Sequence, residues 1–303
     1  MIGFADALSE LSPDLIVVLG DRFEIFAAVS VAMVARIPVA HLYGGESTEG
    51  LIDEAIRHSI TKMSHLHFVG AEEYRQRVIQ LGEQPERVIL VGGLGIDNIS
   101  RLKLLDRTEL EASINFKFKQ KNLLITFHPV TLEKGSAIEQ MVVILTALAE
   151  LKDTGLIFTM PNSDTDGRAL IKLVEEFVKQ HANACAYTSL GQLRYLSCIA
   201  QVDGVVGNSS SGLAEVPSFK KGTINIGDRQ RGRLQAASVI NCEPTSLAIT
   251  TALQELYSSD FQKKLSQARN PYGEGGATKK IIAALKSVSL DGILKKCFYN
   301  REC

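Results

Sequence analysis

Three carboxylates near the start of the chain follow strand-like runs, at positions where one ligand could touch all of them. Asp21 comes directly after the apolar run 14–20, Glu46 follows a glycine pair that ends the run 38–44, and Asp53 opens the next helical pattern. Carboxylates that converge on one place repel each other, and this cost is typical of acid–base sites. The spacing therefore predicts proton-transfer chemistry.

Simpler explanations exist for two of these residues. Asp21 could cap a helix, because aspartate at such a junction accepts backbone N–H bonds. Asp53 suits the first turn of a helix, where the macrodipole favours anions, and Asp53 and Arg57 have the spacing of an ordinary i,i+4 pair. The convergence of all three carboxylates is what favours a site.

Three further segments carry residues suited to bind an anion. His128 ends the run ITFH, a serine-rich loop follows in VVGNSSSGLAEV, and three arginines follow in INIGDRQRGR. Serine hydroxyls, backbone N–H groups at a helix start and paired guanidinium donors all bind phosphate oxygens. A serine cap and a solvated charged turn are the plainer alternatives. The loop matches neither a dinucleotide nor a Walker fingerprint.

Composition excludes several classes of protein. The net charge of −1 argues against a nucleic-acid platform, and no apolar run reaches the ~18–20 residues that cross a bilayer. The opening MIGFADALSE lacks a basic region typical of a signal peptide, so we expect a cytoplasmic protein. The five cysteines are scattered without a CxxC pair, so we expect no metal.

Short β-branched runs alternate with amphipathic segments along the chain. We expect strands at 14–20, 38–44, 65–70, 88–93, 122–129, 156–162, 184–189, 202–209 and 223–228. We expect helices near 22–35, 50–64, 71–81, 133–152, 164–181 and 190–201. This alternation predicts two doubly wound α/β units of Rossmann type, and ligands of such sheets bind at the carboxyl ends of the strands.

Taken together and in this order, the motifs resemble the hydrolysing UDP-N-acetylglucosamine 2-epimerases of sialic and legionaminic acid biosynthesis. The similar phrases are GDRFE, GGESTEGLIDEAIRHSITK, VGGLGIDNI, FHPVTLE, GNSSSG and NIGDRQRGR, within about residues 14 to 236. The resemblance implies a GT-B-like arrangement with the nucleotide sugar in a cleft between two domains. We expect a partial N-terminal domain over 1–115, to which a helix in about 275–303 returns, and a nucleotide-binding domain over 116–274.

The resemblance also implies a reaction that requires no cofactor and no metal. UDP is eliminated across C1–C2 of UDP-GlcNAc or a UDP-diacetamido sugar, and water then adds to give the free C2-inverted sugar. Asp21, Glu46 and Asp53 would share the base and acid roles, without any one being assigned to the C2 proton. The residues that would contact sugar, diphosphate or ribose are Arg22, His128, Ser209, Ser210, Glu215 and Arg229.

The start of the chain departs from the family pattern. Family members begin with a strand and a Gly-rich basic turn, whereas this chain starts with the helical segment MIGFADALSELS. We therefore expect the first domain to be truncated at its N-terminus. Three alternatives stay open: a non-hydrolysing epimerase, an inactive UDP-sugar-binding fragment, and a glycosyltransferase of the same architecture. The resemblance further implies a homodimer.

Overall fold

The computed structural model describes residues 1–49, 52–129, 136–161 and 167–300, and the chain divides into two compact units. Unit 1 comprises Met1–Asp97 and Tyr272–Cys303, and unit 2 comprises Asn98–Pro271. The division falls earlier than the expected 115/116, because Leu110 and Ile114 pack into the core of unit 2.

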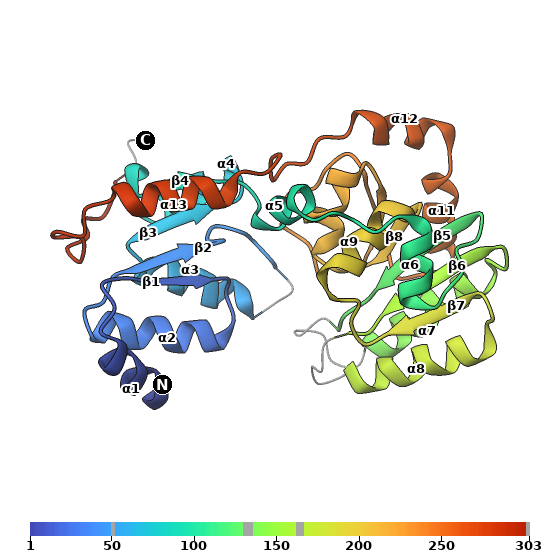
Figure 1. The fold of residues 1–303 in the computed structure, drawn as a ribbon, viewed down its shortest axis with the longest axis horizontal. Coiled ribbons are helices and arrows are strands. Elements are labelled where there is room, and N and C mark those ends of the chain that lie inside the picture. Colours follow the sequence, from blue (N-terminus) through green and yellow to red (C-terminus); the bar gives the residue numbers. More distant parts are fainter. Residues whose placement is uncertain (50–51, 130–135, 162–166, 301–303) are drawn as a thin grey trace. The chain divides into compact units, whose positions relative to one another are not determined.

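Unit 1 is a four-stranded parallel sheet in the order β1-β2-β3-β4 (Figure 1). Its strands are β1 (Ile16–Leu19), β2 (Val39–Leu42), β3 (Leu66–Val69) and β4 (Val88–Leu90). Its helices are α1 (Ile2–Leu11), α2 (Phe23–Val34), α3 (Asp53–Met63), α4 (Glu72–Gln80), the 3₁₀ turn η1 (Pro85–Arg87) and α13 (Ala277–Ser287). The helix α5 (Leu94–Arg101) carries the chain into unit 2.

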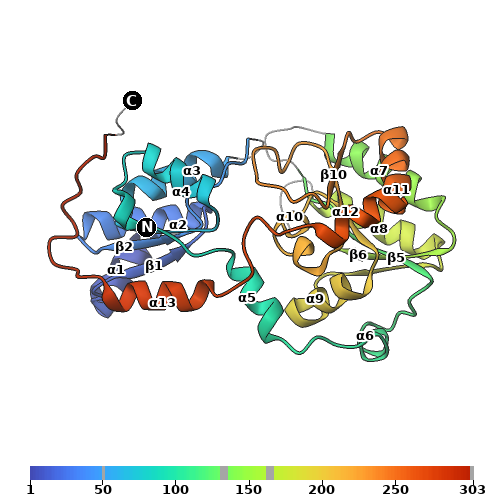
Figure 2. The same ribbon diagram turned by 90° about the horizontal axis from the view of Figure 1, so that it is seen from above.

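Alternation along the strands of unit 1 sends side chains to two separate cores. Val18 and Val39 face α2 and α3, where they pack with Val29 and Ile60. The opposite face, with residues such as Phe68, is covered by α13, which Figure 2 shows on the other side of the sheet from α3 and α4. The last helix of the chain thus completes the first sheet.

The return of α13 is fixed by a carboxylate at its N-terminus. Asp97, which is 4% exposed, accepts hydrogen bonds from the backbone N–H groups of Gly276 at 2.6 Å, Ala277 at 3.1 Å and Thr278 at 2.7 Å. These N–H groups have no partner within the helix, so the carboxylate satisfies them and complements the macrodipole.

Unit 2 is a six-stranded parallel sheet in the order β10-β9-β8-β5-β6-β7. Its strands are β5 (Lys121–Thr126), β6 (Thr154–Thr159), β7 (Ala184–Tyr187), β8 (Gly204–Gly207), β9 (Gly222–Ile226) and β10 (Val239–Cys242). Its helices are α6 (Arg107–Ile114), α7 (Ser136–Ala149), α8 (Gly167–Gln180), α9 (Gly191–Gln201), α10 (Ser211–Ala214), the 3₁₀ turn η2 (Val216–Phe219), α11 (Ser246–Leu256) and α12 (Ser259–Gln267).

Helices cover both faces of the second sheet. Residues of α7, α8, α11 and α12 pack on one face, and residues of α6, α9 and η2 pack on the other. Strands enclosed in this way are buried on both faces, as the burial of all five residues of β9 shows.

The expected fold class, two doubly wound α/β units of GT-B-like type, is confirmed. The sequence analysis did not anticipate β10, α5, α6, α11 and α12. Among the described residues, the structure contains no helix whose length and hydrophobicity would let it span a bilayer.

Candidate active site

Two turns at the carboxyl ends of β1 and β2 place Asp21 and Glu46. Asp21 follows Gly20, whose carbonyl accepts a hydrogen bond from His41 Nε2 at 2.9 Å. Glu46 follows Gly45, which has φ 80° and whose Cβ, if present, would lie 2.3 Å from the Tyr74 carbonyl oxygen. Only glycine fits that turn, and the turn leaves Glu46 8% exposed at the strand end.

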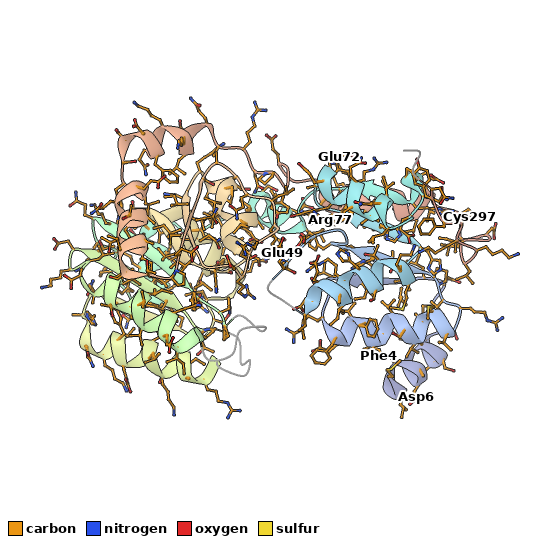
Figure 3. The ribbon with its side chains drawn as sticks, turned by 180° about the vertical axis from the view of Figure 1, so that it is seen from behind. Phe4, Asp6, Glu49, Glu72, Arg77 and Cys297 are labelled. Carbon is orange, nitrogen blue, oxygen red and sulfur yellow. The ribbon has the colours of Figure 1, made fainter. Side chains whose placement is uncertain are left out.

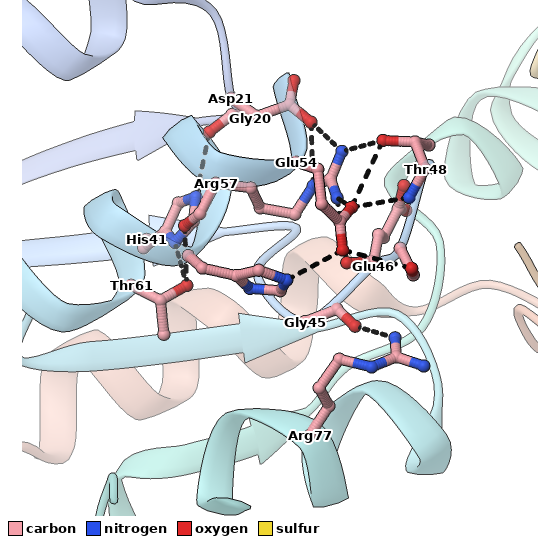
Figure 4. Close-up of polar contacts among 12 residues, drawn as sticks. Gly20, Asp21, His41, Gly45, Glu46, Thr48, Glu54, Arg57, Thr61 and Arg77 are labelled. Atoms are coloured by element: carbon pink, nitrogen blue, oxygen red, sulfur yellow. Dashed lines mark hydrogen bonds and ion pairs between the residues drawn. The ribbon is translucent and has the colours of Figure 1, made fainter. Parts of the chain in front are cut away.

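A buried guanidinium joins these two turns. Arg57 of α3 is fully buried, and its Nε and Nη2 donate to Asp21 Oδ2 at 2.8 and 2.6 Å (Figure 4). Its Nη1 donates to the Glu46 carbonyl oxygen at 2.9 Å, and Nη2 also donates to Thr48 Oγ1 at 2.7 Å. The guanidinium therefore holds in place the two turns that carry Asp21 and Glu46.

Glu54, one turn before Arg57 on α3, is the third carboxylate of this network. Its Oε2 accepts from Arg57 Nη1 at 2.6 Å and from the Thr48 N–H at 2.6 Å. Its Oε1 lies 3.0 Å from His58 Nε2 and accepts from Ser47 Oγ at 3.1 Å. We call Asp21, Glu46, Glu54 and Arg57 the carboxylate–arginine network.

Interactions within the network shift the pKa values of Glu54 and Arg57. Burial favours neutral Glu54, but the Thr48 N–H, His58 and Arg57 outweigh it and lower the pKa of Glu54 to about 2. Burial likewise opposes the charge of Arg57, yet Asp21, Glu46 and Glu54 together raise its pKa. At neutral pH, Arg57 and Glu54 are therefore both charged, and their hydrogen-bond partners hold them in place.

Two expected site residues of unit 1 lie outside this network. Asp53 occupies the first turn of α3, and Arg57 pairs with Glu54 and Asp21 instead of forming the i,i+4 pair that was the plainer alternative for Asp53. Arg22 is the N-cap residue of α2, and its exposed guanidinium lies 3.3 Å from Glu24. Arg57 and Glu54 were visible in the sequence, but spacing alone did not single them out.

In unit 2, one buried amide links three strand ends. Asn208, which is 1% exposed, follows β8; its Oδ1 accepts from the His128 N–H at 2.7 Å and its Nδ2 donates to the His128 carbonyl at 2.8 Å. Its own carbonyl accepts from Arg229 Nη1 at 3.1 Å and Gln230 Nε2 at 2.7 Å. Three of the expected segments, which begin at His128, Asn208 and Arg229, are thus brought together.

The serine-rich loop lies between β8 and α10. Ser209 Oγ accepts from the Ser211 N–H at 3.4 Å, and both Ser209 and Ser210 remain half-buried. The helix that follows, α10, has only four residues, so its macrodipole is weaker than the sequence suggested. Anion binding here would depend on hydroxyl groups and arginine.

Glu215 ends α10, close to a tyrosine that the sequence analysis did not consider. Burial raises the pKa of Tyr195 to about 12, and the Glu215 carboxylate contributes to this rise. Tyr195 therefore stays protonated at neutral pH.

The arginines after β9 differ in their surroundings. Arg229 contacts Asn208, whereas Arg231 forms an exposed ion pair with Asp228 at 3.3 Å. Among the described residues, no group of His, Cys, Asp and Glu side chains is arranged to hold a metal ion.

Known proteins resemble this chain along nearly its whole length. The family model described as UDP-N-acetylglucosamine 2-epimerase matches residues 1–286. The GDP/UDP-N,N'-diacetylbacillosamine 2-epimerase (hydrolyzing) of Campylobacter jejuni is 41% identical over 98% of this chain and 77% of that protein. The UDP-N,N'-diacetylbacillosamine 2-epimerase (hydrolyzing) of Legionella pneumophila is 36% identical over 98% of this chain and 77% of that protein.

Solved structures share the fold. The UDP-GlcNAc 2-epimerase from Neisseria meningitidis bound to UDP-GlcNAc superimposes with a TM-score of 0.83 at 21% identity, over 95% of this chain and 80% of that one. The UDP-GlcNAc 2-epimerase of Methanocaldococcus jannaschii in complex with UDP-GlcNAc and UDP gives a TM-score of 0.75 at 17% identity, over 94% and 79% of the two chains.

The two parallel sheets with polar strand ends define a GT-B-like α/β protein. Within that class, the chain belongs to the UDP-N-acetylglucosamine 2-epimerase family.

Proposed function

We propose that this protein is a hydrolysing UDP-sugar 2-epimerase. It would break the C1–O bond of a UDP-linked 2-acetamido sugar, release UDP, and add water to give the free sugar inverted at C2. The carboxylate–arginine network carries this proposal, because Arg57 binds the Asp21 carboxylate and the Glu46 backbone carbonyl at the ends of two adjacent strands. Relatives at 36–41% identity are named as hydrolysing 2-epimerases.

The first step needs a base at C2 and stabilisation of the leaving diphosphate. A carboxylate takes the C2 proton, the electron pair forms the C1–C2 double bond, and the C1–O bond breaks with its electrons leaving on UDP. In the second step, water adds its hydroxyl group to C1, and an acidic group returns a proton to the other face of C2. Such proton transfers require groups held in place before the reaction.

We assign these roles within the network as follows. Asp21 and Glu46 exchange protons with substrate, because they end the strands and their turns are fixed by Arg57. Glu54 takes the place expected for Asp53 and acts as a positioning residue, since its low pKa makes it a weak base and its oxygens bind Arg57, Thr48 and His58. The residues of unit 2 supply the binding of UDP.

Diphosphate binding would fall to the segments joined by Asn208. Arg229 offers a guanidinium fork, Ser209 and Ser210 offer hydroxyl donors, and His128 lies at the adjacent strand end. Glu215, at the end of the same loop, would accept hydrogen bonds from the ribose hydroxyls. We keep Arg22 as a sugar or diphosphate contact.

The sugar we favour is a 2,4-diacetamido sugar. The relatives from Campylobacter jejuni and Legionella pneumophila carry that substrate in their names, whereas the UDP-N-acetylglucosamine 2-epimerase of Neisseria meningitidis serogroup B is 30% identical. We also propose a homodimer in the cytoplasm, which size-exclusion chromatography with light scattering and cell fractionation would test.

Parallel incubations with UDP-N,N'-diacetylbacillosamine and UDP-GlcNAc in D₂O test the function. We expect release of UDP, free C2-inverted sugar carrying deuterium at C2, and faster turnover of the diacetamido substrate. A persistent mixture of two UDP-sugars would instead indicate a non-hydrolysing epimerase. Calorimetric binding of UDP without any release from either substrate would indicate an inactive binding fragment, and transfer of the sugar to an acceptor would indicate a glycosyltransferase.

A further inference from the structure

A polar pocket lies in unit 1, away from the carboxylate–arginine network. It has a volume of about 260 Å³ and is lined by residues that precede β3, follow α4 and belong to the C-terminal segment. His65 stands immediately before β3, at the amino end of the parallel sheet, whereas Asp21 and Glu46 follow the carboxyl ends of β1 and β2. The pocket therefore belongs to the opposite edge of this sheet.

The C-terminal wall of the pocket is firmly attached. Lys296 Nζ donates to the carbonyl oxygens of Lys62 at 2.9 Å and Ser64 at 2.5 Å, and lies 2.7 Å from Glu83 Oε2. Three residues on, the Tyr299 N–H donates to the Gly82 carbonyl at 2.9 Å. Cys297, labelled in Figure 3 on this segment, lines the same pocket.

His65 presents a hydrogen-bond donor to this pocket. Its Nδ1 accepts from the Val39 N–H at 3.1 Å, so in the neutral ring the proton is on Nε2. Burial above all lowers the pKa of His65 to about 4, so the ring is neutral at physiological pH. The side chain is 8% exposed, lines the pocket, and has no partner for Nε2 among the described residues.

Cations outnumber anions on the walls. Arg87 and Lys295 line the pocket and form no side-chain ion pair or hydrogen bond with any residue that the structure describes. Glu83 is already neutralised, because it accepts from Lys62 at 2.6 Å and lies within 3.0 Å of both Lys296 and His67. The remaining carboxylate, Glu86, is exposed at the rim.

We propose that this pocket binds a small oxyanion, a phosphate or a carboxylate, between His65 Nε2, Arg87 and Lys295. Neutral N–H and cationic donors around one small space are the arrangement that recognises such groups. The volume suits an anion or a short organic acid and is smaller than typical sites for drug-sized ligands. This site is separate from the proposed epimerase function and does not depend on it.

The test is a titration of the full-length protein with inorganic phosphate and, in a second arm, acetate, at constant ionic strength. The imidazole ¹⁵N signals report each of the six histidines separately. We expect the Nε2 signal of His65 to shift and saturate. Saturation with phosphate alone would identify phosphate as the ligand, and saturation with both would identify the broader oxyanion class.

Two double variants with the same change of charge separate this site from general electrostatics. Arg87→Gln with Lys295→Gln should weaken the response of His65 by at least about tenfold, the worth of one charge-assisted hydrogen bond. Lys279→Gln with Lys286→Gln, on α13, should leave it unchanged. Equal weakening in both double variants, or a His65 signal that never saturates, would overturn the proposal.

A third variant keeps this proposal apart from the diphosphate site. Phosphate could also bind near His128 and Arg229, so Arg229→Gln should abolish the response of His128 and preserve that of His65. Loss of the His65 response in Arg229→Gln would show that the signal originates from the other site, and the pocket would then not be an oxyanion site.

Discussion

The polar strand ends of the two units are held together by different kinds of side chain. Unit 1 surrounds the buried Arg57 guanidinium with carboxylates and carbonyls, whereas unit 2 joins its strand ends through the neutral amide of Asn208. A charged network fixes the direction of acidic groups before substrate arrives, as proton transfer requires. A neutral joint orders donors without adding negative charge beside a bound diphosphate.

The largest effect should come from the reacting carboxylates of unit 1. We expect Glu46→Gln and Asp21→Asn each to lower kcat by about 10²–10⁴-fold, the usual contribution of a positioned acid or base. Because unit 2 is unchanged, UDP affinity measured by calorimetry should stay close to that of the wild type. Glu72→Gln, at an exposed position of α4, is the matched control. Wild-type rates in both carboxylate variants would contradict the assignment.

The next effect concerns the stability of unit 1. Arg57→Met leaves Asp21 and Glu54 without their cation, and we expect a loss of roughly 2–4 kcal/mol, less than for a fully buried pair because both carboxylates are partly exposed. Amide hydrogen exchange followed by mass spectrometry should show faster exchange in α3 and β1. Exchange in β5 and β8 should not change; uniform acceleration would mean that the two units unfold together.

A binding defect should arise from the other unit. We expect Arg229→Gln to weaken UDP binding by about 10–100-fold, as for loss of a charge-assisted hydrogen bond. KM should rise more than kcat falls, because the proposed role of Arg229 is to bind UDP and not to move a proton. Arg231→Gln removes only an exposed pair with Asp228 and serves as the control. A kcat defect as large as that of Glu46→Gln would contradict the assignment of proton transfer to unit 1 and of UDP binding to unit 2.

Acid should destabilise unit 1 before unit 2. The pKa values of Glu54 and Glu83 are both lowered to about 2 in the folded protein, from 4.5. Between these values the unfolded chain binds more protons, so their stabilisation is complete above pH 4.5 and is lost as the pH falls towards 2. Hydrogen exchange corrected for intrinsic rates should reveal a loss of roughly 1–3 kcal/mol in unit 1. Equal losses in β3 and β5 would refute this.

The smallest effect should follow from substitution of Asp53, the residue next to Glu54. We expect Asp53→Asn to alter kcat by less than about threefold, because Asp53 stands outside the network, whereas Glu54→Gln should lower kcat at least about tenfold. Steady-state UDP release measures both. A large defect in Asp53→Asn would restore the assignment made from the sequence alone.

The sequence predicted the strand ends well because glycines mark them. Asp21 follows Gly20 and the serine loop follows Gly207, so the polar residues at both strand ends were apparent before the structure. The choice between Asp53 and Glu54 was not, because successive helical residues point about 100° apart and only the packing of α3 decides which one faces Arg57.

Some elements went unnoticed despite local signals. Asp106 and Glu109 form a capping box at the start of α6, and Thr245 and Ser258 cap α11 and α12. The capping box of α6 lies in the charged segment 101–122, whose hydrophobic patterning is poor. The boundary between the units depends on Leu110 and Ile114 packing against α9, a contact between distant segments that no local pattern contains.

The anchoring of α13 by Asp97 has a consequence for the order of events during synthesis. The sheet that is translated first lacks the cover for Phe68 and its neighbours until the residues after Tyr272 leave the ribosome. Unit 2 is continuous from Asn98 to Pro271, so it can fold before the last segment of unit 1 has been synthesised. We therefore expect unit 1 to reach its native state after unit 2.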